Sequence, residues 1–391
     1  MDPLRSATRG ALNRVGGATV DLQMVGSIDA GDGPFVFGIK NGWLALWRGG
    51  GIFGRPTLSL HALADMQPLK TVVLRGTVPG GSSHSAKAKY LAVDPLANRI
   101  AVCWSASADF AAPAWELNTH IYDCVSSHDV AFAGLPTRSP GLTGTELAAF
   151  SPTGRMLAAP NPLGSVVHLI DVDSVLDSNR ENRPVERLGS VGAGGSVGIA
   201  WSPDGQLLAH FCEGVGAPML EFWRLPNGDD PEQIHADKLV AVRVPGKIGG
   251  FGFPHRREVV FSPDNDLVAV AGLSKPNVLR LYSVTRGEFV AESAPLDDEV
   301  KKLAFSPDGL QLFSGDSKGS VVAWRLEGAD RPSLVMGPSA SLGREIIGLA
   351  VDRDTQMLWI ASELNKKLHV HTAALPGSRA VVLTDQGQIV G

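Results

Sequence analysis

"FSPDGLQLFSGDSKGSVVAWRL", residues 305–326, is the stretch of sequence that decides the fold. An apolar run reaches a Pro-Asp-Gly turn, a second apolar run follows at once, and after Ser-Lys-Gly a third run reaches Trp324. Asp-Gly supplies the positive φ that tight turns between antiparallel strands require. The stretch therefore predicts three consecutive antiparallel strands.

The same pattern recurs along the chain at intervals of about 45 to 60 residues, which is the length of a propeller blade. In each unit, a strand reaches the turn, a second strand follows directly, a third often ends on an aromatic residue, and a fourth apolar segment closes the unit. The copies read "GIKNGWLALW" from Gly38, "VDPLANRIAV" from Val93, "FSPTGRMLAA" from Phe150, "WSPDGQLLAH" from Trp201, "FSPDNDLVAV" from Phe261, "FSPDGLQLFS" from Phe305 and "VDRDTQMLWI" from Val351.

We therefore predict an all-β fold, a single seven-bladed β-propeller of four-stranded antiparallel blades over residues 18–391. Residues 18–28 close the last blade, and they compete for that place with the apolar run at 379–385. Residues 1–17 are expected to be a flexible basic tail. An irregular β-sandwich with chance turns is the alternative fold. The blades are expected at about 29–76, 77–134, 135–191, 192–245, 246–296, 297–338 and 339–391.

The Ser-Pro-Asp-Gly turns and the third-strand tryptophans Trp223 and Trp324 resemble the WD-repeat family, over roughly residues 19–391. The resemblance implies a propeller that binds other proteins. Two features depart from the family pattern. Arginine follows both tryptophans where the family has aspartate, and no Gly-His pair opens a blade. Because those residues build a hydrogen-bonded network in the family, these blades are expected to be held mainly by packing.

The bulk composition restricts the class of protein. The 391 residues carry a formal net charge of −5, so bulk electrostatics do not favour a polyanion, and no nucleic-acid partner is expected. Cys103, Cys124 and Cys212 show no metal-site spacing and read as reduced thiols, which predicts an intracellular and most simply a cytoplasmic protein. Three arginines in residues 1–17 leave import into an organelle as an alternative.

No catalytic motif stands out, so the sequence predicts no catalytic residue, no cofactor, no metal and no enzyme. His369 and His371 are two apart on a predicted strand and therefore share a face. This spacing would suit two zinc ligands, but it also fits ordinary histidines on the face of a strand. "GAGGSVG" (192–198) precedes a strand, whereas a phosphate-binding loop precedes a helix. "DDPEQIHAD" (229–237) reads as a solvated loop. An enzyme with a site assembled across blades remains an alternative.

The long loops sort to one face of the predicted propeller, which we call the top face. There lie the turns from second to third strands and the connections between blades; turns from first to second and from third to fourth strands form the bottom face. The top loops are basic, glycine-rich and partly aromatic, which predicts a partner-binding face formed by Arg55, Lys87, Arg138, Lys247, Phe251, Phe253, Arg256 and Arg257. Most loop acids fall at the bottom: Asp173, Asp177, Asp229, Asp230, Glu232, Asp264, Asp266 and Asp354.

The favoured function is a non-catalytic scaffold that binds protein partners, as a subunit or adaptor of a larger assembly. A second hypothesis comes from the segments "THIYDC" and "LAAFSPTGRMLAAPNPLGSVVHLIDV", which are similar to PROPPINs, the phosphoinositide-binding propellers of autophagy. That family grips phosphates with a Phe/Leu-Arg-Arg-Gly motif. The nearest match here is "HRRE" (255–258), where Glu258 replaces the glycine. This similarity makes a phosphoinositide membrane the alternative partner.

Overall fold

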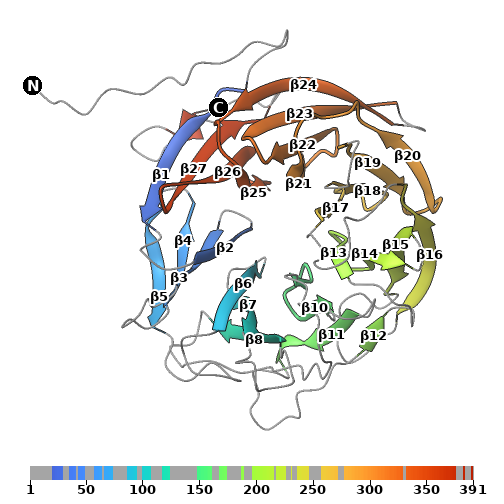
Figure 1. Ribbon diagram of the computed structural model, residues 1–391, viewed down its shortest axis with the longest axis horizontal. Helices are drawn as coiled ribbons and strands as arrows, with labels where there is room; N and C mark the ends of the chain where they lie inside the picture. The colour runs from blue at the N-terminus through green and yellow to red at the C-terminus, as the bar shows by residue number, and fades with distance from the viewer. Residues whose placement is uncertain are drawn as a thin grey trace, which may run out of the picture.

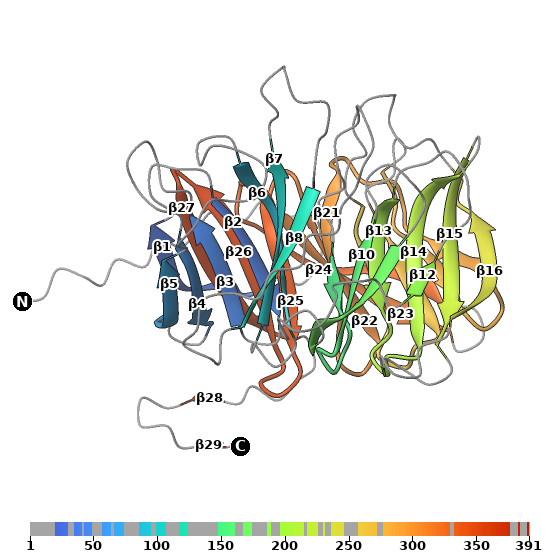
Figure 2. The same cartoon turned by 90° about the horizontal axis from the view of Figure 1, so that it is seen from below.

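The computed structural model is a ring of antiparallel β-sheets around a central axis (Figure 1), and Figure 2 shows that the strands run between the two faces of the ring. The predicted all-β propeller of antiparallel sheets is thereby confirmed. No helix in the described part of the chain is long and apolar enough to cross a membrane. The structure describes residues 20–29, 35–40, 43–48, 57–63, 66–73, 86–94, 99–106, 117–123, 148–160, 167–173, 186–188, 196–214, 217–225, 230, 236–245, 257–271, 277–328, 332–375, 382–383 and 389–390.

Within these residues, six sheets have four strands, one has three, and a two-stranded pair lies near the C-terminus. The first sheets in chain order contain β2 (Phe35–Lys40), β3 (Trp43–Arg48), β4 (Thr57–Ala62) and β5 (Pro68–Val73), then β6 (Ala86–Val93), β7 (Arg99–Ala106) and β8 (Leu117–Asp123). The next contain β9 (Ala149–Phe150), β10 (Met156–Pro160), β11 (Val167–Asp171) and β12 (Glu186–Leu188), then β13 (Ser196–Trp201), β14 (Leu207–Gly214), β15 (Ala217–Arg224) and β16 (Asp237–Arg243).

Two further sheets follow the same order of strands. They contain β17 (Val259–Phe261), β18 (Leu267–Val270), β19 (Arg280–Ser283) and β20 (Glu288–Glu292), then β21 (Val300–Phe305), β22 (Gln311–Asp316), β23 (Ser320–Glu327) and β24 (Ser333–Ser341). In each sheet the first strand lies toward the ring axis and the last lies outside (Figure 1).

The last sheet joins the two ends of the chain. It contains β25 (Ile346–Asp352), β26 (Met357–Leu364) and β27 (Lys367–Ala374), and its outermost strand is β1 (Gln23–Asp29). The pairing runs from Gln23 opposite Thr372 to Asp29 opposite Lys367. The competing run contributes β28 (Val382–Leu383), which pairs with β29 (Ile389–Val390). The structure therefore gives the closing place to the N-terminal strand.

The inner strands form a closed circle. They contact one another in the order β2, β6, β9, β13, β17, β21 and β25, and β25 contacts β2 again. Closure matters because an open ring would leave an unprotected sheet surface at each end. Every sheet in the circle therefore packs between two neighbours.

The Ser-Pro-Asp turns that the sequence repeats share one hydrogen-bond pattern. The Ser202 backbone N–H donates to Leu207 O (2.9 Å), and its hydroxyl oxygen accepts the Leu207 N–H (2.8 Å) while donating to Asp204 Oδ1 (2.6 Å). Asp204 Oδ1 also accepts the Gln206 N–H (3.0 Å). Gly205 completes the turn at φ 74°, a conformation that favours glycine or asparagine. The turns that begin at Ser262 and Ser306 repeat these contacts.

Trp324 shows how neighbouring sheets pack. Its side chain is 1% exposed and lies in an apolar cluster between the β17–β20 and β21–β24 sheets, with Leu281 and Leu312. The indole Nε1–H donates to Ser314 Oγ (2.8 Å) on the neighbouring strand β22. The expected burial of this third-strand tryptophan is confirmed, and a side-chain hydrogen bond adds to the packing.

We predict that Trp324→Ala lowers the free energy of unfolding by about 3–5 kcal/mol, because a large buried ring is removed without full collapse of the space. Trp324→Phe keeps a ring in the cluster and loses the bond to Ser314, so it should cost less. Urea unfolding of the three proteins measures both changes. Equal unfolding midpoints for wild type and Trp324→Ala would contradict the packing described here.

Candidate functional site

The predicted partner-binding residues fall mostly outside the described part of the chain. Lys87 lies on β6, where the structure describes the backbone. Arg257, at the end of the loop 245–258, is the member of the set whose side chain is described. The residues outside the described ranges are Arg55, Arg138, Lys247, Phe251, Phe253 and Arg256.

The expectation that Arg257 is exposed on the top face was wrong. The residue is 5% exposed and lies two positions before β17. Its backbone N–H donates to Val197 O (2.7 Å) on β13, and its Nη1 lies 3.3 Å from Glu299 Oε1 just before β21. Arg257 therefore links three neighbouring sheets, and its guanidinium is engaged inside the ring.

A second buried arginine fixes the other end of the same loop. Arg280, on β19, is 6% exposed, and its Nη1 donates to Pro245 O (2.9 Å). Its Nε lies 3.3 Å from Glu292 Oε2 on the neighbouring strand β20. Because Pro245 and Arg257 stand at the two ends of the loop, two buried guanidinium groups hold both ends to the β17–β20 sheet and its neighbour.

Charged side chains surround the Arg257 end of the loop in paired contacts. Glu299 also contacts Lys301 Nζ (2.7 Å), and Lys302 Nζ lies 3.4 Å from Glu258 Oε2. Burial alone would raise the pKa of Glu299, but the Lys301 ammonium and the Arg257 guanidinium outweigh it, and the pKa is lowered. Glu299 therefore stays ionised at neutral pH, and the contacts join β17 to β21.

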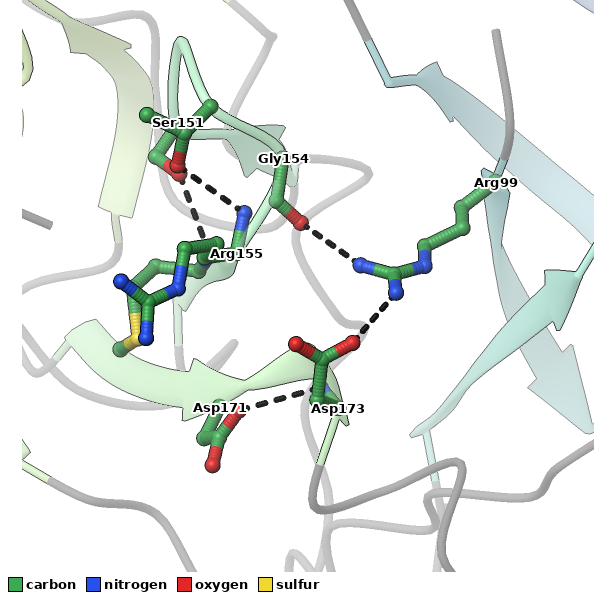
Figure 3. Close-up of polar contacts among 8 residues, drawn as sticks. Arg99, Ser151, Gly154, Arg155, Asp171 and Asp173 are labelled. Carbon is green, nitrogen blue, oxygen red and sulfur yellow. Dashed lines mark hydrogen bonds and ion pairs between the residues drawn. The ribbon is translucent and has the colours of Figure 1, made fainter. Parts of the chain in front are cut away.

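The bottom face carries a second polar network, which Figure 3 shows between the β6–β8 and β9–β12 sheets. Arg99 donates through Nη1 to Gly154 O (3.3 Å) and pairs through Nη2 with Asp173. Asp171 Oδ1 in turn accepts the Asp173 N–H (3.0 Å). The Ser151 hydroxyl accepts the N–H that ends the same turn, at Met156 (3.1 Å). These contacts hold a turn of one sheet against a strand of the next.

The described bottom-face acids serve mainly as caps and ion-pair partners. Asp230 lies 3.2 Å from Arg155 Nη2, across a sheet boundary. Asp264 and Asp266 accept hydrogen bonds within and beside the Ser262 turn, and Asp354 is exposed. The remaining acids of the predicted set, Asp177, Asp229 and Glu232, lie outside the described residues.

One buried group of side chains could supply metal ligands. His210 and Cys212 on β14 and Glu221 on β15 are all buried, and their ligand atoms lie within 4.8 Å of one another. Lys238, on β16, contacts Glu221 through its ammonium and lies 5.5 Å from the centre of the Trp223 ring. That ammonium places a positive charge beside the carboxylate, and this charge would repel a metal cation at the same position. We therefore interpret the group as a buried ion-pair network.

The electrostatics of Glu221 agree with this interpretation. Burial would raise the pKa of its carboxyl, but the hydrogen bonds and charges of His210 and Lys238 lower it to about 2. The His210 Nδ1 lies 3.4 Å from Glu221 Oε2. Glu221 is thus an ionised carboxylate enclosed in the β13–β16 sheet with its partners beside it.

Comparison with known proteins agrees with this geometry. Residues 291–325 match the family model of the WD domain, G-beta repeat. The crystal structure of the Cps50 (Swd1) β-propeller domain from Myceliophteria thermophila is similar over 90% of this chain and 99% of its own, with a TM-score of 0.54 and 12% identity. The chain folds as a β-propeller and contains a stretch that matches the WD repeat. No curated protein matches its sequence.

The matched stretch of this propeller contains the Ser306 turn and Trp324, the features from which the repeat was read in the sequence. The buried arginines of the loop ends were missed. Arg257 comes just before an apolar strand and Arg280 begins one, and that position is the signal that could have indicated burial. Their partners Glu299 and Pro245 lie more than thirty residues away, so the pairing itself has no local signal.

We predict that Arg257→Ala lowers the free energy of unfolding by about 2 kcal/mol, the range for losing a hydrogen bond to a charged group. In this variant Glu299 keeps its ion pair with Lys301 and is partly exposed, which limits the loss of stability. The matched control, Arg286→Ala, removes an exposed arginine paired with Glu288 and should change the value by no more than about 0.5 kcal/mol. Thermal or urea unfolding of wild type and both variants measures the two changes in stability. Equal, small effects for both variants would show that Arg257 is not engaged as described.

Glu221 also predicts an acid-sensitive component of stability. Its folded pKa of about 2 lies below the ordinary value of 4.5, so its contribution is present above pH 4.5 and is lost as the pH falls toward about 2. Glu221→Gln should be less stable than wild type at neutral pH, and this difference should shrink through that window. Urea unfolding at several pH values measures the difference. A difference that stays constant with pH would contradict the assignment.

Proposed function

We propose that this propeller is a non-catalytic scaffold that binds protein partners through its top face, as a subunit or adaptor of a larger intracellular assembly. The observation that carries the proposal is the anchoring of the loop 245–258. Arg280 holds the loop at Pro245, and Arg257 holds its other end against Glu299. Loops presented by a rigid framework are where binding residues concentrate.

The composition of the loop supports a protein partner. Lys247 and Arg256 supply positive charge, while Phe251 and Phe253 supply apolar anchors in a glycine-rich stretch. Arginine and aromatic residues are enriched in the centres of protein interfaces. Arg55 and Arg138, in other loops of the same face, and Lys87, at the start of β6, extend the proposed basic surface. An acidic protein surface is the partner of matching charge.

Two finer features belong to the same proposal. We propose a ring of seven blades, with the three-stranded β6–β8 sheet as the second blade and the β25–β27 sheet with β1 as the last.

We also propose that the protein works in the cytoplasm. Cys212 is buried and forms no disulfide with a described residue, which suits a reducing compartment.

The burial of Arg257 argues against the phosphoinositide alternative. In "HRRE", Arg257 is buried and engaged with Glu299, and Glu258 lies 3.4 Å from Lys302 Nζ. A pair of arginines that grips a headgroup needs both guanidinium groups at the surface. This geometry favours a protein partner over a membrane, and the experiment below keeps the membrane as a separate outcome.

The test is a double charge reversal, Lys247→Glu with Arg256→Glu, which leaves the buried Arg257 in place. The matched control is Arg224→Glu with Arg353→Glu, two exposed arginines of the bottom face. Each tagged protein is used to capture partners from its native source, and the captured proteins are quantified by mass spectrometry. We expect wild type and control to retain the same near-stoichiometric proteins and the top-face variant to lose them.

Two results would contradict the scaffold. The first is that no protein is retained in near-stoichiometric amount, and the second is that the top-face variant retains the same proteins as wild type. The membrane alternative is tested by a second experiment, in which each protein is floated with phosphoinositide vesicles. Vesicle binding by wild type that the top-face variant loses, without any change in protein partners, would replace the scaffold with the lipid function.

A further inference from the structure

Three polar side chains share one side of the sheet that closes the ring, and a fourth, Arg344, stands in the connection that leads into it. Ser362 on β26 lies directly opposite His369 on β27, and His371 lies two residues further along the same strand. These three side chains therefore share a face of the sheet. Ile360, which pairs with His371, packs in the apolar cluster against the β21–β24 sheet, so this face is turned toward that sheet. Arg344 lies in the connection between β24 and β25.

Each of these side chains has a buried polar atom without a hydrogen-bond partner among the described residues. Ser362 is 0% exposed and His371 is 6% exposed. Native proteins pair nearly all of their buried polar groups, and an unpaired one is costly. Several unpaired atoms in one place point to a ligand that pairs with them. The atoms are Ser362 Oγ, His369 Nδ1, His371 Nδ1 and Arg344 Nε.

The charge at this position favours an anion over a metal cation. Burial and the positive charge of Arg344 lower the pKa of both histidines, that of His371 to about 4. Lys367, at the start of β27, acts on His369 in the same direction. A cation bound to the two imidazoles would meet the same positive field. An anion would be attracted by it, although Glu345 and Glu363 are exposed nearby in the sequence.

We propose that Arg344, Ser362, His369 and His371 form a binding site for a phosphate-like oxyanion. The guanidinium and the hydroxyl donate to its oxygens, and the neutral imidazole of His371 donates from Nδ1 in the Nδ1–H tautomer, while His369 lines the site. An oxyanion with several acceptor oxygens matches several converging donors. Because Ser362 and His371 are buried, the site takes a small anion or a single phosphate group. The site lies on a different sheet from the loop 245–258, and it goes beyond the scaffold function.

The test follows the imidazole signals of His369 and His371 by NMR, in the full chain with labelled histidine. Inorganic phosphate is added while chloride keeps the ionic strength constant. The signals are assigned with His369→Asn and His371→Asn. We expect both signals to shift saturably with phosphate, and to stay in place when chloride alone is varied. Unshifted signals, or equal shifts with chloride, would overturn the proposal.

The variants Arg344→Gln and Arg353→Gln form a matched pair, because Arg353 is an exposed arginine on the bottom face of the same sheet. Arg344→Gln should weaken phosphate binding by about tenfold or more, since it removes a charged donor. Arg353→Gln should leave binding unchanged. Equal binding by wild type and Arg344→Gln would overturn the proposal. If Arg344→Gln does not fold, Ser362→Ala decides in its place, with severalfold weaker binding expected and unchanged binding contradicting the site.

Vesicle flotation separates the two sources of a phosphate group. Binding to phosphoinositide vesicles that inorganic phosphate competes away, and that Arg344→Gln loses, supports the site with a lipid headgroup as its anion. Saturable phosphate shifts without vesicle binding support the site with a free anion. Phosphatidylcholine vesicles serve as the uncharged control.

Discussion

Pairing of β1 with β27 is the interaction on which the rest of the structure depends. It places a strand from the beginning of the chain in the sheet built from its end, with Ile28 opposite Leu368 in the apolar core. The boundary between this last sheet and the β2–β5 sheet is also packed through the contact of β25 with β2, and the pairing adds backbone hydrogen bonds that tie the two ends of the chain together there. The last sheet thereby keeps its fourth strand, and its buried faces stay covered and out of water.

Much of the fold could be predicted from the sequence because its cause is local. The Ser-Pro-Asp turn is specified by its own side chains: the Ser202 hydroxyl and the Asp204 carboxylate satisfy the backbone of the turn, and Gly205 adopts the positive φ. Burial of Trp324 follows from its place in an apolar third strand. The choice between β1 and the run at 379–385 was not predictable, because both are apolar and the register depends on residues hundreds of positions away.

The candidate site was predictable only in part, for a related reason. A loop rich in glycine, arginine and phenylalanine is visible in the sequence, but burial of Arg257 depends on Val197 and Glu299, which belong to other sheets. The loop ends are therefore part of the framework, and only the residues between them remain candidates for contact. The acids of the bottom face were also predictable only in part. Their positions followed from the repeat, while their roles as caps and ion-pair partners, such as Asp230 with Arg155, required the structure.

Native-state hydrogen exchange of the intact protein tests closure by β1 most directly. If β1 closes the ring, the β1 amides that donate to β27 should exchange with about the same opening free energy as those of β26 and β27, because the strand is released only when the whole sheet opens. Mass spectrometry of peptides that cover residues 23–29 and 357–374 gives both values in one experiment. Rapid exchange of every amide in residues 23–29 beside a fully protected β27 would contradict closure by β1, since it would show that the ring holds without the N-terminal strand.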